Sequence, residues 1–281
     1  MSALSINDLR VELGKDKSHR TEVVKGISLE LVPGRIHGLA GESGSGKSMT
    51  ALAVLGLLPA GGIVRGSIVL RGETELVGLK PKAYRAIRGN RIAMVFQDPS
   101  ASLHPQITVG AQIIDGMRAH LRLNRADARR RAAELLALVR VPDAEAALTK
   151  YPHQFSGGQR QRIAIAIALA CDPDVLLADE PTTALDVTVQ AGILHLLRDL
   201  AVERDLAILL VTHDLGVMSA VADDVSVMRH GRIVESGPRR RIFTDPRHPY
   251  TRELLAAMPD ARESLVDAPP VTTTTDSEEW R

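Results

Sequence analysis

The stretch Gly41-Glu42-Ser43-Gly44-Ser45-Gly46-Lys47-Ser48 matches the pattern G-x-x-x-x-G-K-[ST]. An apolar segment, 35–40, precedes it and a segment with helical spacing, 47–58, follows it, so the pattern lies between a strand and a helix. The N–H groups of such a loop converge on one point, and the helix N-terminus adds partial positive charge. The loop therefore predicts a nucleoside triphosphate site. Lys47 would reach the β- and γ-phosphates and Ser48 would suit Mg²⁺, and the remaining contacts are expected from Gly41, Glu42, Ser43, Gly44, Ser45, Gly46 and Met49.

Polar side chains follow three further apolar segments at the point where each ends. Gln97 follows 92–96, Asp179 and Glu180 follow 175–178, and His213 follows 206–212. In a parallel sheet these points share the carboxyl edge, where open α/β sheets bind ligands, so we expect the three strand ends to converge with the loop. Two adjacent carboxylates after a buried strand would repel each other unless a cation or a bound water uses them. Asp179 therefore suits a Mg²⁺ ligand and Glu180 a general base.

The order of the segments predicts an α/β protein. Short β-like stretches occupy the first 40 residues, and later helices alternate with buried apolar strands, which favours a parallel sheet covered on both faces. Between them lies an Arg- and Ala-rich stretch with helical spacing and no strand signals. We expect a β subdomain with the first part of the core at 1–98, a helical insert at 99–155, the second part of the core at 156–240, a C-terminal extension at 241–261 and a disordered tail at 262–281.

The composition excludes several classes of protein. The 281 residues carry 35 Lys and Arg against 34 Asp and Glu, a net charge of +1, so no global charge points to nucleic acid or lipid. Aromatic residues make up 2%, which leaves few platforms for stacking bases of single-stranded nucleic acid. The single cysteine, Cys171, lies in an apolar run and fits a reducing cytoplasm. No apolar run approaches the roughly 18 to 20 residues of a membrane span.

A second candidate anion site follows the helical insert. Ser156 caps the start of a helix at Phe155-Ser156-Gly157-Gly158-Gln159, some two dozen residues before Asp179. With this stretch the chain resembles the ATP-binding cassette family, whose signature is LSGGQ. The resemblance covers residues 4–258 and implies a P-loop NTPase (RecA-like) core with a parallel sheet, an N-terminal antiparallel β subdomain and the helical insert. It further implies ATP and Mg²⁺ as ligands, with the metal bound by Gln97, Asp179 and Ser48. Catalytic roles are implied for Glu180, His213, Gln97 and Lys47. Further nucleotide contacts are implied for Ser156, Gly157, Gly158, Gln159 and Asp186.

A finer resemblance is to the importer ATPases of the dipeptide/oligopeptide permease type, which include nickel importers. It rests on 95–100 (VFQDPS), 151–154 (YPHQ), 178–188 (ADEPTTALDVT), 212–217 (THDLGV) and 248–251 (HPYT). Two departures stand out. No cysteine follows Cys171, so we expect no iron–sulfur cluster of the kind some members hold. Residues 1–83 also lack the aromatic ring expected near adenine, for which His19 or Arg20 is the nearest substitute.

The resemblance implies an ATPase subunit that powers uptake of small peptides from the cytoplasmic face of the cell membrane. Its expected partners are two integral membrane permease subunits, a second cassette ATPase that is either a paralogue or a second copy, and, indirectly, an extracytoplasmic solute-binding protein; no nucleic acid is expected. Nickel import is the alternative. A soluble cassette ATPase acting on nucleic acid or ribosomes is disfavoured, because such proteins usually carry two cassettes or a long coiled-coil insertion.

Overall fold

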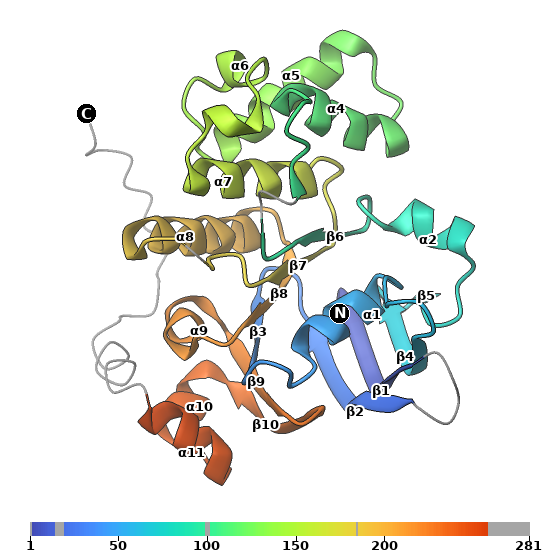
Figure 1. Ribbon diagram of the computed structural model, residues 1–281, viewed down its shortest axis with the longest axis vertical. Helices are drawn as coiled ribbons and strands as arrows, with labels where there is room; N and C mark the ends of the chain where they lie inside the picture. Colours follow the sequence, from blue (N-terminus) through green and yellow to red (C-terminus); the bar gives the residue numbers. More distant parts are fainter. Residues whose placement is uncertain (1, 15–19, 99–101, 184, 258–281) are drawn as a thin grey trace.

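The computed structural model of the protein describes residues 2–14, 20–98, 102–183 and 185–257. His19 and the tail expected at 262–281 lie outside the described residues. Figure 1 shows a β-rich N-terminal region beside a central sheet, a group of helices from the middle of the chain on one side of that sheet, and α11 at the C-terminal end of the described chain.

Six strands form the central sheet: β3 (Ile36–Ala40), β6 (Ile92–Val95), β7 (Val175–Asp179), β8 (Ala207–Thr212), β9 (Asp224–Arg229) and β10 (Arg232–Pro238). Their order is β10-β9-β3-β8-β7-β6. All neighbours pair parallel except β10, which pairs antiparallel with β9. Both β7 and β8 are buried along their whole length, as parallel strands covered on both faces are. The expected parallel sheet is confirmed.

A smaller sheet precedes and flanks the central one: β1 (Leu4–Leu13), β2 (Thr21–Leu31), β4 (Ile63–Leu70) and β5 (Thr74–Glu75). It is antiparallel throughout, with strand order β2-β1-β4-β5. The antiparallel N-terminal sheet expected from the resemblance is therefore present.

The helices fall into groups that Figure 1 separates. Those of the insert pack on one another and on α7, and α8 and α9 lie beside the central strands. Their bounds are α1 (Lys47–Val54), α2 (Pro81–Ile87), α4 (Val109–His120), α5 (Arg125–Leu138), α6 (Ala144–Ala147), the 3₁₀ helix η2 (Pro152–Gln154), α7 (Gly157–Ala168), α8 (Val187–Glu203), α9 (Leu215–Val221), α10 (Arg239–Thr244) and α11 (Pro249–Ala256).

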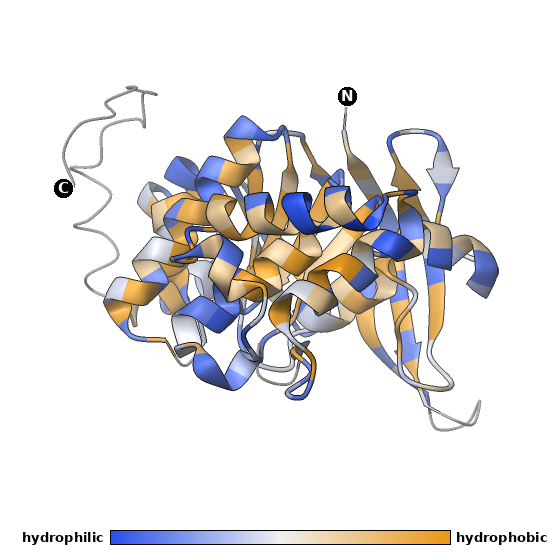
Figure 2. Cartoon of the chain, turned by 90° about the horizontal axis from the view of Figure 1, so that it is seen from above, coloured by the Kyte–Doolittle hydropathy of each residue, from blue (hydrophilic) through white to orange (hydrophobic). Residues whose placement is uncertain are grey.

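The central sheet separates two apolar cores, because successive side chains of a strand point to opposite faces. In β7, Leu176 packs into the core shared with α4, α5, α7 and α8, and Leu177 packs into the core shared with α1 and the antiparallel sheet. Figure 2 shows this arrangement as orange strands and helix faces toward the middle of the molecule, with blue residues on outer turns. The helical insert therefore packs into the core on one face of the sheet. Helix α1, which follows the phosphate loop, packs into the core on the other face.

Two predicted boundaries are wrong. The helix after the loop ends at Val54 and not at Leu58, because the N–H groups of Gly56 and Leu57 bond back to the carbonyls of Ala53 and Leu52 and close it. The sequence predicts the next strand at 66–71, but β4 begins at Ile63, because its first residues pair with β1.

Candidate nucleotide site

The loop at 41–48 joins β3 to α1, as its pattern predicts. Gly41 has a φ of +148°, and a Cβ there would lie 2.2 Å from the carbonyl oxygen of Met228, so a side chain cannot be accommodated. The turn after β9 holds the loop from the same side, since the N–H of Gly231 donates to the carbonyl of Ser45 at 2.9 Å. The loop is therefore fixed by the strand next to it in the sheet.

Lys47 points back into the curve of the loop. Its Nζ donates to the carbonyl oxygens of Gly41 at 2.7 Å and Glu42 at 2.8 Å. The side chain is buried, which lowers the pKa of its ammonium, and the charges of Glu180 and Asp179 oppose that shift. An ammonium that donates to backbone carbonyls of the loop is suited to exchange these carbonyls for phosphate oxygens.

Asp179 and Ser48 form a pair of oxygen ligands at the loop. Ser48 Oγ donates to Asp179 Oδ1 at 3.0 Å. Burial raises the pKa of the Asp179 carboxyl, and the hydrogen bond from Ser48 opposes that rise. A buried carboxylate beside a hydroxyl, next to a phosphate-binding loop, offers the hard oxygen donors that Mg²⁺ prefers, so the residues present fit this metal.

Glu180 collects donors from three segments. Its Oε2 accepts from Gln97 Nε2 at 2.7 Å and from Thr183 Oγ1 at 3.0 Å, and its Oε1 lies 2.9 Å from His213 Nδ1. Burial alone would raise the pKa of this carboxyl, but the hydrogen bonds from His213 and Thr183 and the charges of His213 and Lys47 lower it on balance. Glu180 is thus a carboxylate at neutral pH.

The backbone at Glu180 lies in the left-handed region, with a φ of +47°. A non-glycine residue costs about 1–3 kcal/mol in such a conformation, and strain of this kind is concentrated at functional sites. The polar residues that follow β6, β7 and β8 therefore meet the loop at one edge of the sheet, where the sequence places them.

The residues around Ser156 lie elsewhere in the chain's fold. Ser156 Oγ accepts from the N–H of Gln159 at 3.3 Å, and Gln159 Oε1 accepts from the N–H of Ser156, a capping box at the start of α7. Gly158 is buried against α8, where a Cβ would lie 2.4 Å from Val189 Cγ1. Helix α7 packs on the face of the sheet opposite α1, so the structure does not bring these residues to the loop of their own chain.

Two other predicted ligands have local roles within the chain. Asp186 caps α8 by accepting from the N–H of Val189 at 2.9 Å. The Met49 side chain packs against the core beneath α1, which leaves its backbone as the part that can face phosphate. Of the two candidates for the adenine, Arg20 has a buried Nε with no hydrogen-bond partner among the described residues, and His19 is not described.

Two contacts of the site were not predicted from the sequence. Thr183 bonds Glu180, and the hydroxyl of Tyr250, from the first turn of α11, accepts from the N–H of Glu42 at 3.3 Å. In the sequence, the stretch 248–251 stands out only through the family resemblance. A fully buried tyrosine hydroxyl needs a partner, but its burial is visible only in the fold.

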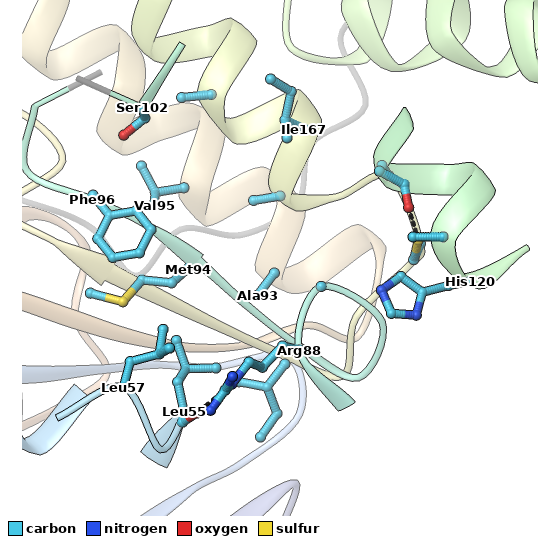
Figure 3. A pocket seen from close by; sticks show the side chains of 18 of the residues that line it. Leu55, Leu57, Arg88, Ala93, Met94, Val95, Phe96, Ser102, His120 and Ile167 are labelled. Atoms are coloured by element: carbon cyan, nitrogen blue, oxygen red, sulfur yellow. Dashed lines mark hydrogen bonds between the residues drawn. The ribbon is translucent and has the colours of Figure 1, made fainter. Parts of the chain in front are cut away.

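An apolar groove of about 340 Å³ lies between the central sheet and the helical insert (Figure 3). Phe96, directly before Gln97, points into it from the end of β6, and Leu57 lies across from it. Both are unusually open for large apolar residues, with 43% and 40% of their surface exposed. On the far side the groove is lined by α4 and α7 residues, among them His120 and Ile167.

Within the described residues, no helix is both long and apolar enough to cross a membrane.

The strand, loop and helix at 36–54 and the acidic pair that ends β7 define the class of P-loop nucleotide-binding proteins. The family model for the ABC transporter matches residues 24–183, and the model described as the oligopeptide/dipeptide transporter C-terminal region matches residues 234–277. The chain belongs to the ABC transporter family of ATP-binding cassettes.

Individual relatives agree with this assignment. The oligopeptide transport ATP-binding protein OppD of Bacillus subtilis is 46% identical over 263 residues, which cover 93% of this chain and 73% of OppD. The dipeptide transport ATP-binding protein DppD of the same species is 45% identical over 258 residues, 91% of this chain and 76% of DppD. Among solved structures, the dimeric ATP-binding cassette MJ0796 bound to ADP and Pi is 27% identical, with a TM-score of 0.73 over 84% of this chain and 99% of that one. The fold expected from the sequence is confirmed.

Proposed function

We propose that this chain is the ATP-hydrolysing subunit of an importer for small peptides. The observation that carries the proposal is the presence, in one chain, of a phosphate loop bonded through Ser48 to Asp179, with the Glu180 carboxylate next in sequence, and of a C-terminal region like that of oligopeptide and dipeptide transporters. Relatives named for oligopeptide and dipeptide transport, at 46% and 45% identity, support peptides as the solute class.

ATP binds with its phosphates in the loop at 41–48. Lys47 exchanges its bonds to loop carbonyls for phosphate oxygens, and the backbone N–H groups of the loop and of the first turn of α1 supply the remaining donors. Ser48 and Asp179, which bond each other, would hold Mg²⁺ together with Gln97. When bound, the metal neutralises charge on the phosphate oxygens.

Glu180 acts as the general base on the attacking water. Its lowered pKa keeps it deprotonated at neutral pH, and its bonds to Gln97, Thr183 and His213 fix the direction of its oxygens. Since His213 is 60% exposed, its ring can follow a change at the bound phosphate while it remains next to Glu180. Lys47 stabilises the charge that develops on the transferred phosphoryl group.

A second cassette completes the site. Ser156 is the exposed cap of α7, away from the loop of its own chain, and the start of this helix supplies anion-binding N–H groups to the nucleotide of an opposing subunit. Asp186 lies at the start of α8, next to this interface. The opposing subunit is a second copy of this chain or a paralogue; the dimeric state of the MJ0796 cassette supports a pair of cassettes.

The groove beside Phe96 receives a cytoplasmic helix of a membrane subunit. Its apolar lining fits the apolar face of an amphipathic helix, and it is formed jointly by the core and the insert. Because Phe96 and Gln97 are neighbours, a change at Gln97 on nucleotide binding moves the wall of the groove. In this proposal the core (1–98 and 156–240) hydrolyses ATP and the insert (99–155) couples hydrolysis to the membrane subunit. The extension (241–261) belongs to the region that this chain shares with oligopeptide and dipeptide transporters.

The chain then sits at the cytoplasmic face of the membrane, bound to two permease subunits that receive solute from an extracytoplasmic binding protein.

The decisive experiment expresses a tagged copy with these subunits, purifies it from solubilised membranes and reconstitutes it in liposomes. We expect co-purifying integral subunits and ATP-dependent uptake of labelled dipeptides or tripeptides, abolished by Lys47→Ala. Uptake of Ni²⁺ instead of peptide would establish the nickel alternative, and recovery with ribosomes or DNA in place of membrane subunits would overturn the proposal.

A further inference from the structure

The C-terminal extension reaches the nucleotide site through one side chain. Tyr250 lies in the first turn of α11, more than 200 residues after the phosphate loop in sequence, and its side chain is 1% exposed. Its phenol oxygen accepts the N–H of Glu42, the second residue of the loop, at 3.3 Å. None of the roles proposed above uses this contact.

Two elements fix the Tyr250 ring. The guanidinium of Arg229, the last residue of β9, lies 4.3 Å from the ring centroid, and the N–H of Tyr250 donates to Nδ1 of His248, the cap of α11. The start of α11 is itself anchored by Glu235 in β10, whose carboxylate accepts the N–H of Arg247 at 2.9 Å and of His248 at 3.0 Å. The hydroxyl is thus held by the strand pair that also contacts the loop at Gly41 and Ser45.

The backbone of Glu42 is therefore held on both sides. Its N–H donates to Tyr250, and its carbonyl accepts from Lys47 Nζ at 2.8 Å. Bound phosphate would take over the Lys47 side of this pair and leave the Tyr250 side in place. The tyrosine thereby keeps the loop in shape while Lys47 changes partners.

We propose that Tyr250 is a positioning residue of the nucleotide site, whose hydroxyl holds the Glu42 peptide and with it the phosphate loop in the conformation that binds ATP. The inference rests on the proposed function only in taking this loop as the ATP site. It gives the C-terminal extension a direct part in nucleotide affinity.

Tyr250→Phe tests the proposal, since it removes the hydroxyl and keeps the ring beneath Arg229. A loop that samples other conformations binds with reduced apparent affinity, so we expect the Kd and KM for MgATP to rise about three- to tenfold, the size of one lost hydrogen bond, with kcat nearly unchanged. In nucleotide-free protein, the amides of 42–47 should exchange hydrogen faster in the variant.

Tyr84→Phe is the matched control. Tyr84 is also buried beneath an arginine, with Arg88 4.7 Å from its ring centroid, and its hydroxyl donates to the Leu76 carbonyl and not to the loop. It should leave KM and the exchange of 42–47 unchanged. Equal effects of the two substitutions would reduce Tyr250 to a general stabilising residue, and an unaltered Kd and unaltered loop exchange in Tyr250→Phe would overturn the proposal.

A second measurement needs no variant. If loop and extension are coupled, coupling is reciprocal, so MgATP should slow exchange of the amides at 251–255 in wild-type protein and leave those at 83–87 in α2 unchanged. Unchanged exchange at 251–255 on saturation with MgATP would argue against the coupling. Failure of the wild type to bind MgATP would instead defeat the proposed function, and the nucleotide-free exchange experiment would still decide the role of Tyr250.

Discussion

The side-chain amide of Gln97 donates a hydrogen bond of 2.7 Å to Oε2 of Glu180. Gln97 follows β6 and Glu180 follows β7, neighbouring parallel strands, so the bond joins two ends of the sheet at the loop. Because Phe96 precedes Gln97 and lines the groove, this one bond connects the proposed base to the surface proposed for the membrane subunit. In the proposed mechanism, ATP hydrolysis and its coupling to the membrane subunit therefore both depend on the Gln97 side chain.

Glu180→Gln should slow ATP hydrolysis by about 10²- to 10⁴-fold, because an amide cannot take a proton from water. ATP affinity should be retained, since the phosphate ligands of the loop are untouched. Hydrolysis by the assembled transporter and equilibrium binding of ATP measure the two effects. Glu203→Gln, at the exposed end of α8, is the control and should change neither. Hydrolysis at the wild-type rate in Glu180→Gln would show that another group activates water.

Ser156→Arg should block ATP-driven closure of two cassettes while leaving the ATP affinity of a single subunit nearly unchanged. Ser156 is exposed, so the larger side chain fits the monomer, and the lost cap costs helix α7 about 1 kcal/mol. Light scattering in the Glu180→Gln background reports closure. Thr149→Arg places the same charge on the exposed end of the insert and should close normally. Closure by the Ser156 variant equal to that of the control would remove its role in the opposing site.

Much of this site follows from the sequence, because its residues lie next to strong local patterns. Strands β7 and β8 are continuous apolar runs, so the polar residues after them necessarily lie at the sheet's edge. The glycine pattern between a strand and a helix fixes the loop in the same way.

Other features depend on contacts that local patterns do not encode. Helices α2, α9 and α10 have seven, seven and six residues, too few for a periodic signal, and tertiary packing stabilises them. The contact between Tyr250 and Glu42 joins positions 208 residues apart. Nothing near either residue indicates it, apart from the burial of a phenol, which only the fold reveals.

Phe96→Asp should weaken the association with the membrane subunits by about tenfold or more, since burying a phenylalanine contributes roughly 1.5–3 kcal/mol. The yield of co-purified membrane subunits at equal expression measures this. Val202→Asp is the matched control, because Val202 is 46% exposed on α8 and outside the groove. Both variants should bind MgATP like the wild type. Equal recovery of membrane subunits with Phe96→Asp and Val202→Asp would place the docking surface elsewhere.

Glu235→Gln should lower the stability of the protein at pH 7 by about 1–2 kcal/mol, since it removes the charge from two hydrogen bonds to the backbone of the extension. Burial alone would raise the pKa of Glu235, but the hydrogen bonds, foremost from the N–H of Arg247, lower it on balance. A lowered pKa in the folded state means that the stabilisation is present above the ordinary glutamate pKa of about 4.3 and is lost as the pH falls through the folded value.

Urea unfolding of wild type and variant between pH 7 and pH 3.5 tests this dependence. The difference between the two should shrink as the pH falls below the ordinary glutamate pKa of about 4.3, because the unfolded wild-type chain then takes up a proton that the folded carboxylate resists. Glu73→Gln, in the exposed turn before β5, should match the wild type at every pH. A difference that stays constant from pH 7 to pH 3.5 would show that the charge of Glu235 is not what holds the extension.

ATP and GTP should bind with affinities that agree within about tenfold. Stacking on an aromatic ring contributes roughly 1–3 kcal/mol per base, and residues 1–83 offer no such ring. Arg20 can supply a guanidinium plane at the start of β2, and its buried Nε has no partner among the described residues. A guanidinium stacks on either purine, so Arg20→Ala should lower the affinities for ATP and GTP alike, and His19→Tyr should raise both.

Competition titrations against a fluorescent nucleotide measure these affinities, with Arg65→Ala, on the exposed part of β4, as the control. Because about 1.4 kcal/mol corresponds to a factor of ten, a preference for ATP above about a hundredfold would require hydrogen bonds specific to adenine and would contradict recognition through the phosphates.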